Sequence, residues 1–117
     1  MTTGGLTFLL LAANPVDTPL LRLEEEIRAI DRRLRGAAYR DQIDFRPHLA
    51  MRVADLQELL LRYQPGIVHF SGHGTEAGEI LLQDDSGRAQ PVAASALVDL
   101  FGLFRTHVRC IVLNACY

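Results

Sequence analysis

Apolar residues fall along the chain in two kinds of pattern, short and largely apolar runs and helical spacings. Largely apolar runs at residues 6–12 and 67–70 are typical of strands buried in a parallel sheet, and residues 108–115, which are apolar without alternation, are predicted to be the last strand. A further short stretch, 42–47, is predicted to be a strand ending at Pro47, and a proline in a strand favours an edge position. The pattern therefore predicts a mostly parallel sheet.

Three segments between these strands have apolar positions at steps of three and four residues, which predicts helices with one apolar face. They are 19–35, 50–63 and 95–104. For the first we expect Thr18 as the N-cap, Pro19 in the first helical position and Gly36 as the stop. Its acidic residues come early and its basic residues late, which matches the helix dipole.

Residues 79–92 are predicted to form a β-hairpin around a "DDSG" turn. The whole order is then strand, helix, strand, helix, strand, hairpin, helix, strand. This alternation predicts an α/β fold, a three-layer sandwich with a mostly parallel sheet and a hairpin after the third strand. We expect the 117 residues to be one domain, cut off just after its last strand, because a further helix usually covers such a strand.

Composition excludes several classes of function. The net charge is −2 and the 12 basic residues are spread along the chain, so we expect no nucleic-acid partner. The apolar run 6–13 is too short to cross a membrane and has no basic segment before it, so we expect no membrane contact. Two cysteines without an export signal predict a reducing, cytoplasmic setting.

Candidate chemistry lies where the third and last strands end. His73 follows the run 67–70 by three residues, and Cys116 comes directly after the run 108–115. In open α/β sheets, active sites gather beyond the carboxyl ends of the strands, and neighbouring strands are about 4.8 Å apart. A cysteine beside an imidazole forms a thiolate at neutral pH, so the two residues are predicted to be a catalytic dyad.

Glycines flank this histidine. The N–H groups of Gly74 and Cys116 are the natural pair of donors for an oxyanion hole, and Gly72 is expected to let the loop turn sharply. His69, by contrast, is interpreted as a hydrogen-bonded residue of the strand.

Two other interpretations of the same stretch are weaker. A zinc site formed by His69 and His73 at i, i+4 requires a helix, which the glycines and the β-branched lead-in disfavour. The glycines of "GHGTEAG" lack the Gly-Lys-Ser/Thr ending of a phosphate loop. We therefore expect neither a metal nor a cofactor.

Three blocks, "LAANPVDTPLLRLEEEIRAI", "PGIVHFSGHGTEAGEILL" and "VRCIVLNACY", together resemble the CHAT domain, a family of caspase-like cysteine peptidases of clan CD type. The resemblance implies a caspase-like fold, of which residues 1–117 would be the N-terminal, large-subunit-like part. It also implies a His73–Cys116 dyad with Gly74 in the oxyanion hole. Repeat or sensor domains, and a role in bacterial defence or regulated cell death, are implied in the same way.

One departure from the family pattern concerns specificity. Relatives that cleave after basic residues often carry Asp two positions before the cysteine, where this chain has Asn114. The charge of an acidic pocket would have to come from Asp17, Asp84 or Asp85. We expect Asn14, Asp17 and Asn114 to contact the substrate, because their loops border the site.

The leading hypothesis is a cysteine endopeptidase that cleaves a protein substrate. The alternative is a non-catalytic interaction or dimerisation module of the same fold, acting with a partner protein or as a homodimer. A flavodoxin-like receiver domain is weaker, because the loop after the first strand offers only Asp17 where such a domain needs clustered acids.

Overall fold

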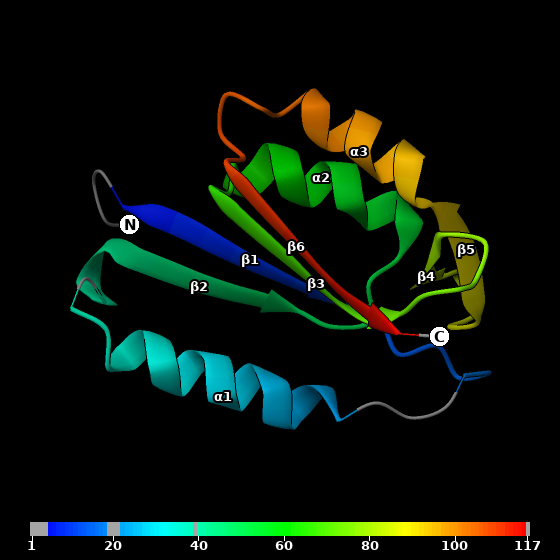
Figure 1. The fold of residues 1–117 in the computed structure, drawn as a ribbon, viewed down its shortest axis with the longest axis horizontal. Helices are drawn as coiled ribbons and strands as arrows, with labels where there is room; N and C mark the ends of the chain where they lie inside the picture. The colour runs from blue at the N-terminus through cyan, green and yellow to red at the C-terminus, as the bar shows by residue number, and fades with distance from the viewer. Residues whose placement is uncertain (1–4, 19–21, 39, 117) are drawn as a thin grey trace.

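The computed structural model describes residues 5–18, 22–38 and 40–116 (Figure 1). In chain order the elements are β1 (Leu6–Ala12), α1 (Leu23–Arg35), a 3-10 turn (Arg40–Gln42), β2 (Ile43–His48), α2 (Val53–Tyr63), β3 (Ile67–His73), β4 (Glu79–Gln83), β5 (Ala89–Ala93), α3 (Ala94–Gly102) and β6 (Cys110–Cys116). The predicted alternation of strands and helices is confirmed.

The main sheet has the order β2-β1-β3-β6, and all of its neighbouring strands are parallel. Helix α1 covers one face, and α2 and α3 cover the other, while β4 and β5 form an antiparallel hairpin beyond the carboxyl ends of the strands (Figure 1). The predicted three-layer α/β sandwich with its hairpin is therefore confirmed. Strand β2, which contains Pro47, lies at an edge of the sheet as predicted.

Hydrophobic side chains fill both spaces between the sheet and its helices, because successive strand residues point to opposite faces. The larger cluster lies on the side of α2 and α3 and includes Leu9, Val68 and Leu60. The smaller cluster lies under α1 and includes Leu10 and Ala12. Strand β1 contributes leucines to both clusters and is therefore the centre of the structure. Each fully buried leucine stabilises the fold by roughly 1.5–3 kcal/mol.

Helix α1 begins later than predicted. Its N-cap is Arg22, and the hydroxyl of Thr18 donates to the carbonyl of Pro15 at 2.7 Å. Thr18 therefore closes a turn after β1 and does not cap the helix, so that prediction was wrong. Pro19 lies outside the described residues. The predicted end of the helix is confirmed, because the N–H of Gly36 donates to the carbonyl of Arg32.

Strand β3 is longer than predicted and reaches His73, because its ladder with β6 continues to the end of both strands. Gly72 is thus a strand residue and does not make a sharp turn. A Cβ at this position would lie 2.8 Å from Cζ of Phe70 and 3.1 Å from the carbonyl oxygen of Ala13. Close packing between β3 and its neighbours therefore explains the glycine.

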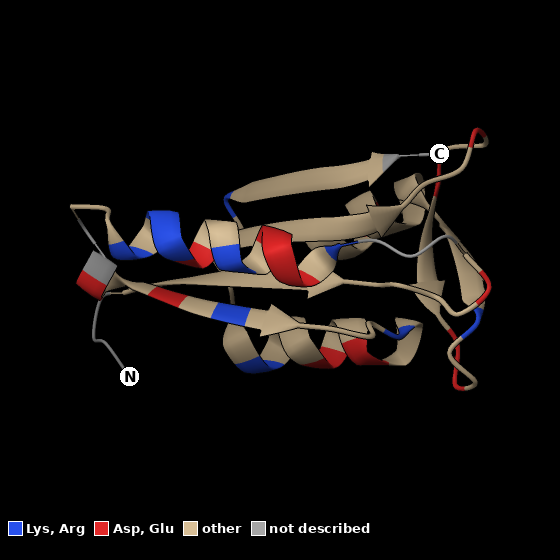
Figure 2. Cartoon of the chain, turned by 90° about the horizontal axis from the view of Figure 1, so that it is seen from below, with Lys and Arg blue, Asp and Glu red and all other residues tan. Residues whose placement is uncertain are grey.

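The charges of α1 are ordered along its length, and its acidic first turn lies at the carboxyl end of the sheet (Figure 2). This orientation brings the start of α1 to the edge where β1, β3 and β6 end. In the part of the chain that the structure describes, no helix is both long and apolar enough to cross a membrane.

Candidate active site

Two adjacent parallel strands bring the backbone positions of His73 and Cys116 together. The register pairs Ser71 with Asn114, and two residues further on it pairs His73 with Cys116. Each of the last two residues ends its strand, so both positions lie at the carboxyl edge of the sheet. The side chain of His73 is half-buried. The predicted pairing of strand ends is present in the backbone, and the catalytic role of the two residues stays a prediction.

Gly74 follows β3 directly and lies against β6. A Cβ at Gly74 would be 3.4 Å from Cβ of Ala115, the residue before Cys116, and Gly74 also forms an isolated bridge with Ile80 of β4. Gly74 therefore lies against the residue that precedes Cys116, just beyond the end of the β3–β6 ladder.

The loop after β1 borders the same edge and is tied to the hairpin. The backbone N–H of Asn14 donates to Oε1 of Gln83 at 3.0 Å. A carboxylate oxygen of Asp17 accepts the N–H of Ala89 at 2.7 Å, and Arg88 lies 3.7 Å from the other oxygen. Asp17 therefore joins the loop to the hairpin, whereas its predicted contact with substrate stays untested.

Asn14 also lines a cavity of about 510 Å³ between the start of α1, the end of β4 and the segment that follows β2. Ala50, on this wall, has a φ of +54°, a left-handed conformation that costs a non-glycine residue on the order of 1 kcal/mol or more. The other lining residues are Arg22, Leu23, Glu24, Glu25, Leu49 and Gln83.

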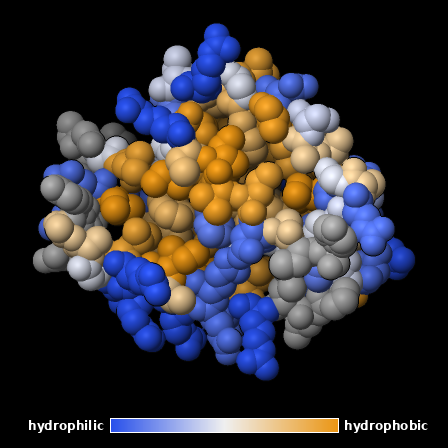
Figure 3. Space-filling view, viewed as in Figure 1, coloured by the Kyte–Doolittle hydropathy of each residue, from blue (hydrophilic) through white to orange (hydrophobic). Residues whose placement is uncertain are grey.

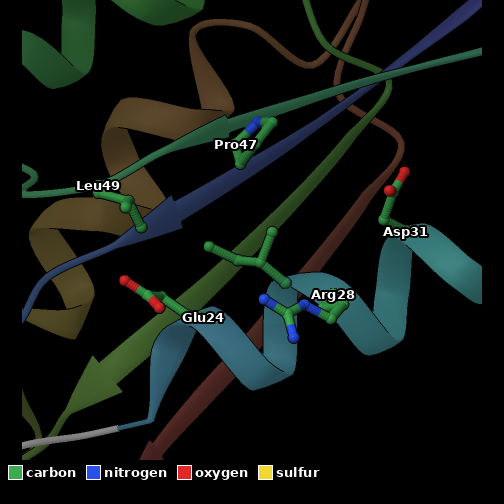
Figure 4. A pocket seen from close by; sticks show the side chains of 6 residues that line it. Glu24, Arg28, Asp31, Pro47 and Leu49 are labelled. Carbon is green, nitrogen blue, oxygen red and sulfur yellow. The ribbon is translucent and has the colours of Figure 1, made fainter.

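A second cavity, of about 400 Å³, lies between α1 and β2 (Figure 4). Glu24 and Leu49 line both cavities, so the two cavities adjoin each other beside α1. None of the predicted site residues lines the second cavity, which leaves the first as the one that adjoins the candidate site.

A polar cluster occupies the α1 face of the sheet beside the paired strand ends. Oε1 of Glu26 accepts a hydrogen bond from the hydroxyl of Ser71 at 2.6 Å and from the side-chain amide of Asn114 at 2.9 Å. Nε2 of His69 lies 3.3 Å from the same oxygen and 3.1 Å from the Ser71 hydroxyl. One carboxylate thus connects α1, β3 and β6.

Glu26 is held in its charged form. Burial on its own raises the pKa of this carboxyl group, but hydrogen bonds from Ser71, Asn114 and His69 and the attraction to His69 outweigh it. The net result is a pKa below the ordinary value for Glu. The cluster is therefore an anion surrounded by donors.

His69 behaves as the strand residue that we predicted. Its side chain is 15% exposed, contacts Glu26 and Ser71, and stacks on Phe8 with a centroid distance of 6.3 Å. These contacts fit a histidine that helps to fill the space under α1.

Glu26 was missed at the level of sequence, where it counted only as one of the early acidic residues that match the helix dipole. Its spacing indicated a position on the buried face of the helix, because Glu26 is three residues after Leu23 and four before Ile30. Both of these residues of α1 pack against the sheet. Glu24 and Glu25 are exposed, whereas Glu26 is half-buried. A carboxylate at core-facing spacing could have been singled out.

The carboxylate beside Asn114 is thus not one of the expected aspartates. Asp84 accepts hydrogen bonds from the hydroxyl and N–H of Ser86 and the N–H of Arg88, and these bonds lower its pKa. Asp85 is 94% exposed and lies 3.8 Å from Arg52. Both belong to the hairpin turn, whereas Glu26 contacts Asn114 directly.

Comparison with known proteins gave one family. The family model described as CHAT domain matches residues 5–117. A search of curated proteins found no match.

Proposed function

Because this chain belongs to the CHAT domain family, a caspase-like, protease-related family, we propose that it is a cysteine endopeptidase domain that cleaves a protein substrate. The observation that carries the proposal is the register that pairs His73 with Cys116 at the ends of adjacent strands. A nucleophile-type and a base-type residue are then one strand spacing apart, at the edge where α/β sheets form their active sites.

The proposed reaction is acyl transfer through the thiol of Cys116. The imidazole of His73 takes the thiol proton, and the thiolate attacks the carbonyl carbon of the scissile peptide bond. The N–H groups of Gly74 and Cys116 stabilise the oxyanion that develops. His73 then protonates the leaving amine, the C–N bond breaks, and water hydrolyses the resulting thioester.

The substrate is proposed to lie along the same edge of the sheet. Asn14 supports this placement, because it lines the cavity of about 510 Å³ beside the loop after β1. We assign contacts with the substrate to Asn14, Asp17 and Asn114, and no cofactor or metal enters the reaction. By family resemblance, the proposed setting is cytoplasmic, in bacterial defence or regulated cell death, alongside a repeat or sensor domain or a partner protein.

The dyad is tested by alkylation of the native protein with iodoacetamide near neutral pH, with each cysteine followed by mass spectrometry. We expect His73→Ala to slow the alkylation of Cys116 by about 10-fold or more, because the imidazole no longer holds the thiolate. Cys110, at the opposite end of β6, is the internal control and should react at an unchanged rate. Equal Cys116 rates in the wild type and the variant would rule out the dyad.

A second function, a non-catalytic dimerisation module, is favoured by the surface of β6. This strand lies at an edge of the main sheet, and Ile111, Val112 and Leu113 are 39%, 40% and 45% exposed. Hydrophobic residues gather at the centre of the face on which β6 lies in front (Figure 3). An exposed, apolar edge strand is a template for pairing with another strand, and we assign a second copy of the chain as the partner.

Light scattering at high protein concentration tests this second function. We expect a dimer for the wild type and a monomer for Val112→Lys, because a lysine on an edge strand opposes strand pairing. Leu103→Lys, which alters another exposed apolar residue outside the strands, is the matched control and should remain dimeric. A monomeric wild type would contradict the module, whereas a dimer without peptide cleavage would favour it over the peptidase.

A further inference from the structure

The carboxylate of Glu26 joins the two strands that carry the proposed dyad. Its Oε1 lies 2.6 Å from Oγ of Ser71 on β3 and 2.9 Å from Nδ2 of Asn114 on β6. Ser71 is two residues before His73, and Asn114 is two residues before Cys116. The backbone positions of residues 73 and 116 are therefore each two residues along the strand from this contact.

We propose that Glu26 is a positioning residue, which holds the ends of β3 and β6 in the relative placement that the dyad requires. The inference rests on the proposed peptidase function. It assigns a purpose to a half-buried carboxylate that helix propensity does not require, because Glu24 and Glu25 satisfy the helix dipole from exposed positions in the same turn.

The contact with Glu26 is expected to matter most at the end of β6. Within the described part of the chain, β6 has β3 as its only neighbour in the sheet, and Ile111, Val112 and Leu113 are exposed. An edge strand paired on one side is more easily displaced than a central one. The bond from Asn114 to Glu26 adds an anchor on α1, two residues before the nucleophile.

The charge of Glu26 makes this anchor strong. Hydrogen bonds to an ionised acceptor are about twice as strong as those between neutral groups. Ser71 is 1% exposed, so removing the acceptor would leave its hydroxyl without the carboxylate in a place that water does not reach. Gln at position 26 keeps one oxygen as an acceptor and loses the charge, whereas Ala removes the anchor entirely.

The test uses the full chain and the rate at which iodoacetamide alkylates Cys116 relative to Cys110 in the same molecule. We expect Glu26→Ala to lower this ratio by about 10-fold or more, because small displacements of reacting groups have large kinetic effects. Glu26→Gln should recover part of the loss. Glu58→Gln, which makes the same change at an exposed glutamate on α2, should leave the ratio unchanged.

If Glu26 had a purely structural role, Glu26→Ala would lower the stability of the protein, so a second control variant tests the effect of lost stability alone. Ile30→Ala removes apolar packing between α1 and the sheet but keeps the side chains of Glu26, Ser71 and Asn114, and should destabilise the protein without changing the alkylation ratio. Amide hydrogen exchange at the last residue pairs of the β3–β6 ladder should accelerate in Glu26→Ala and not in Ile30→Ala. The two variants are compared at denaturant concentrations equally far below their unfolding midpoints.

The outcomes separate this inference from the function on which it rests. If Cys116 reacts no faster than it does in His73→Ala, the peptidase proposal fails and the role of Glu26 in it fails too. In a second outcome, the wild type depends on His73, but Glu26→Ala keeps the wild-type alkylation ratio or lowers it only as much as Ile30→Ala does. Only the positioning role of Glu26 is then overturned.

Discussion

Replacing Cys116 by alanine is expected to reduce peptide cleavage by at least about 10³-fold, because the nucleophile is lost. The proposed reaction passes through a thioester on this residue, and no other cysteine lies near the carboxyl edge of the sheet in the described residues. The measurement is cleavage of a mixed peptide library, with products identified by mass spectrometry.

The matched control is Cys110→Ala. Cys110 begins the strand that Cys116 ends, so the two positions are separated by roughly 20 Å at about 3.3 Å per residue. This variant removes one thiol and leaves the candidate site intact, and its cleavage rate should equal that of the wild type. Cleavage that persists in Cys116→Ala would assign the activity to another residue and defeat the proposed mechanism.

Leu60→Ala is expected to lower the free energy of unfolding by about 2–5 kcal/mol. Leu60 lies on α2, is 0% exposed and belongs to the larger hydrophobic cluster, so truncation removes buried apolar surface and leaves a cavity. A loss of this size is a large fraction of the stability of a small domain. Chemical denaturation followed by circular dichroism measures it.

Leu61→Ala is the control for this prediction, because it makes the same change one residue further along the same helix. Leu61 is 59% exposed, and its replacement should change the free energy of unfolding by less than about 0.5 kcal/mol. Similar losses in the two variants would mean that α2 does not pack on the sheet in the way described.

Hydrophobic patterning was sufficient to predict the architecture. Largely apolar runs such as 6–12 are typical of strands that helices cover on both faces, and the three helices have an apolar face because each packs on the sheet. Pro47 marked an edge strand because proline cannot donate to a ladder on both sides.

Local signals were less reliable at element ends. Thr18 is a good N-cap residue, but its hydroxyl bonds to Pro15 in a turn, and the observed N-cap, Arg22, lies four residues after the expected one. Gly72 suggested a turn, yet the neighbouring strand β6 extends β3 beyond it. At Thr18 a competing local turn overrode the capping preference, whereas at Gly72 the contact with a distant strand overrode the preference for a turn.

The sequence by itself determined the fold class and the backbone pairing of His73 with Cys116. Strands that alternate with helices form a parallel sheet, and the carboxyl ends of its strands lie at one edge. Only the tertiary structure decided that Glu26 joins Ser71 and Asn114, and that β6 is an exposed edge. Those contacts unite residues from three separate elements. Their distances depend on how α1 is placed over the sheet, which periodicity along the chain does not specify.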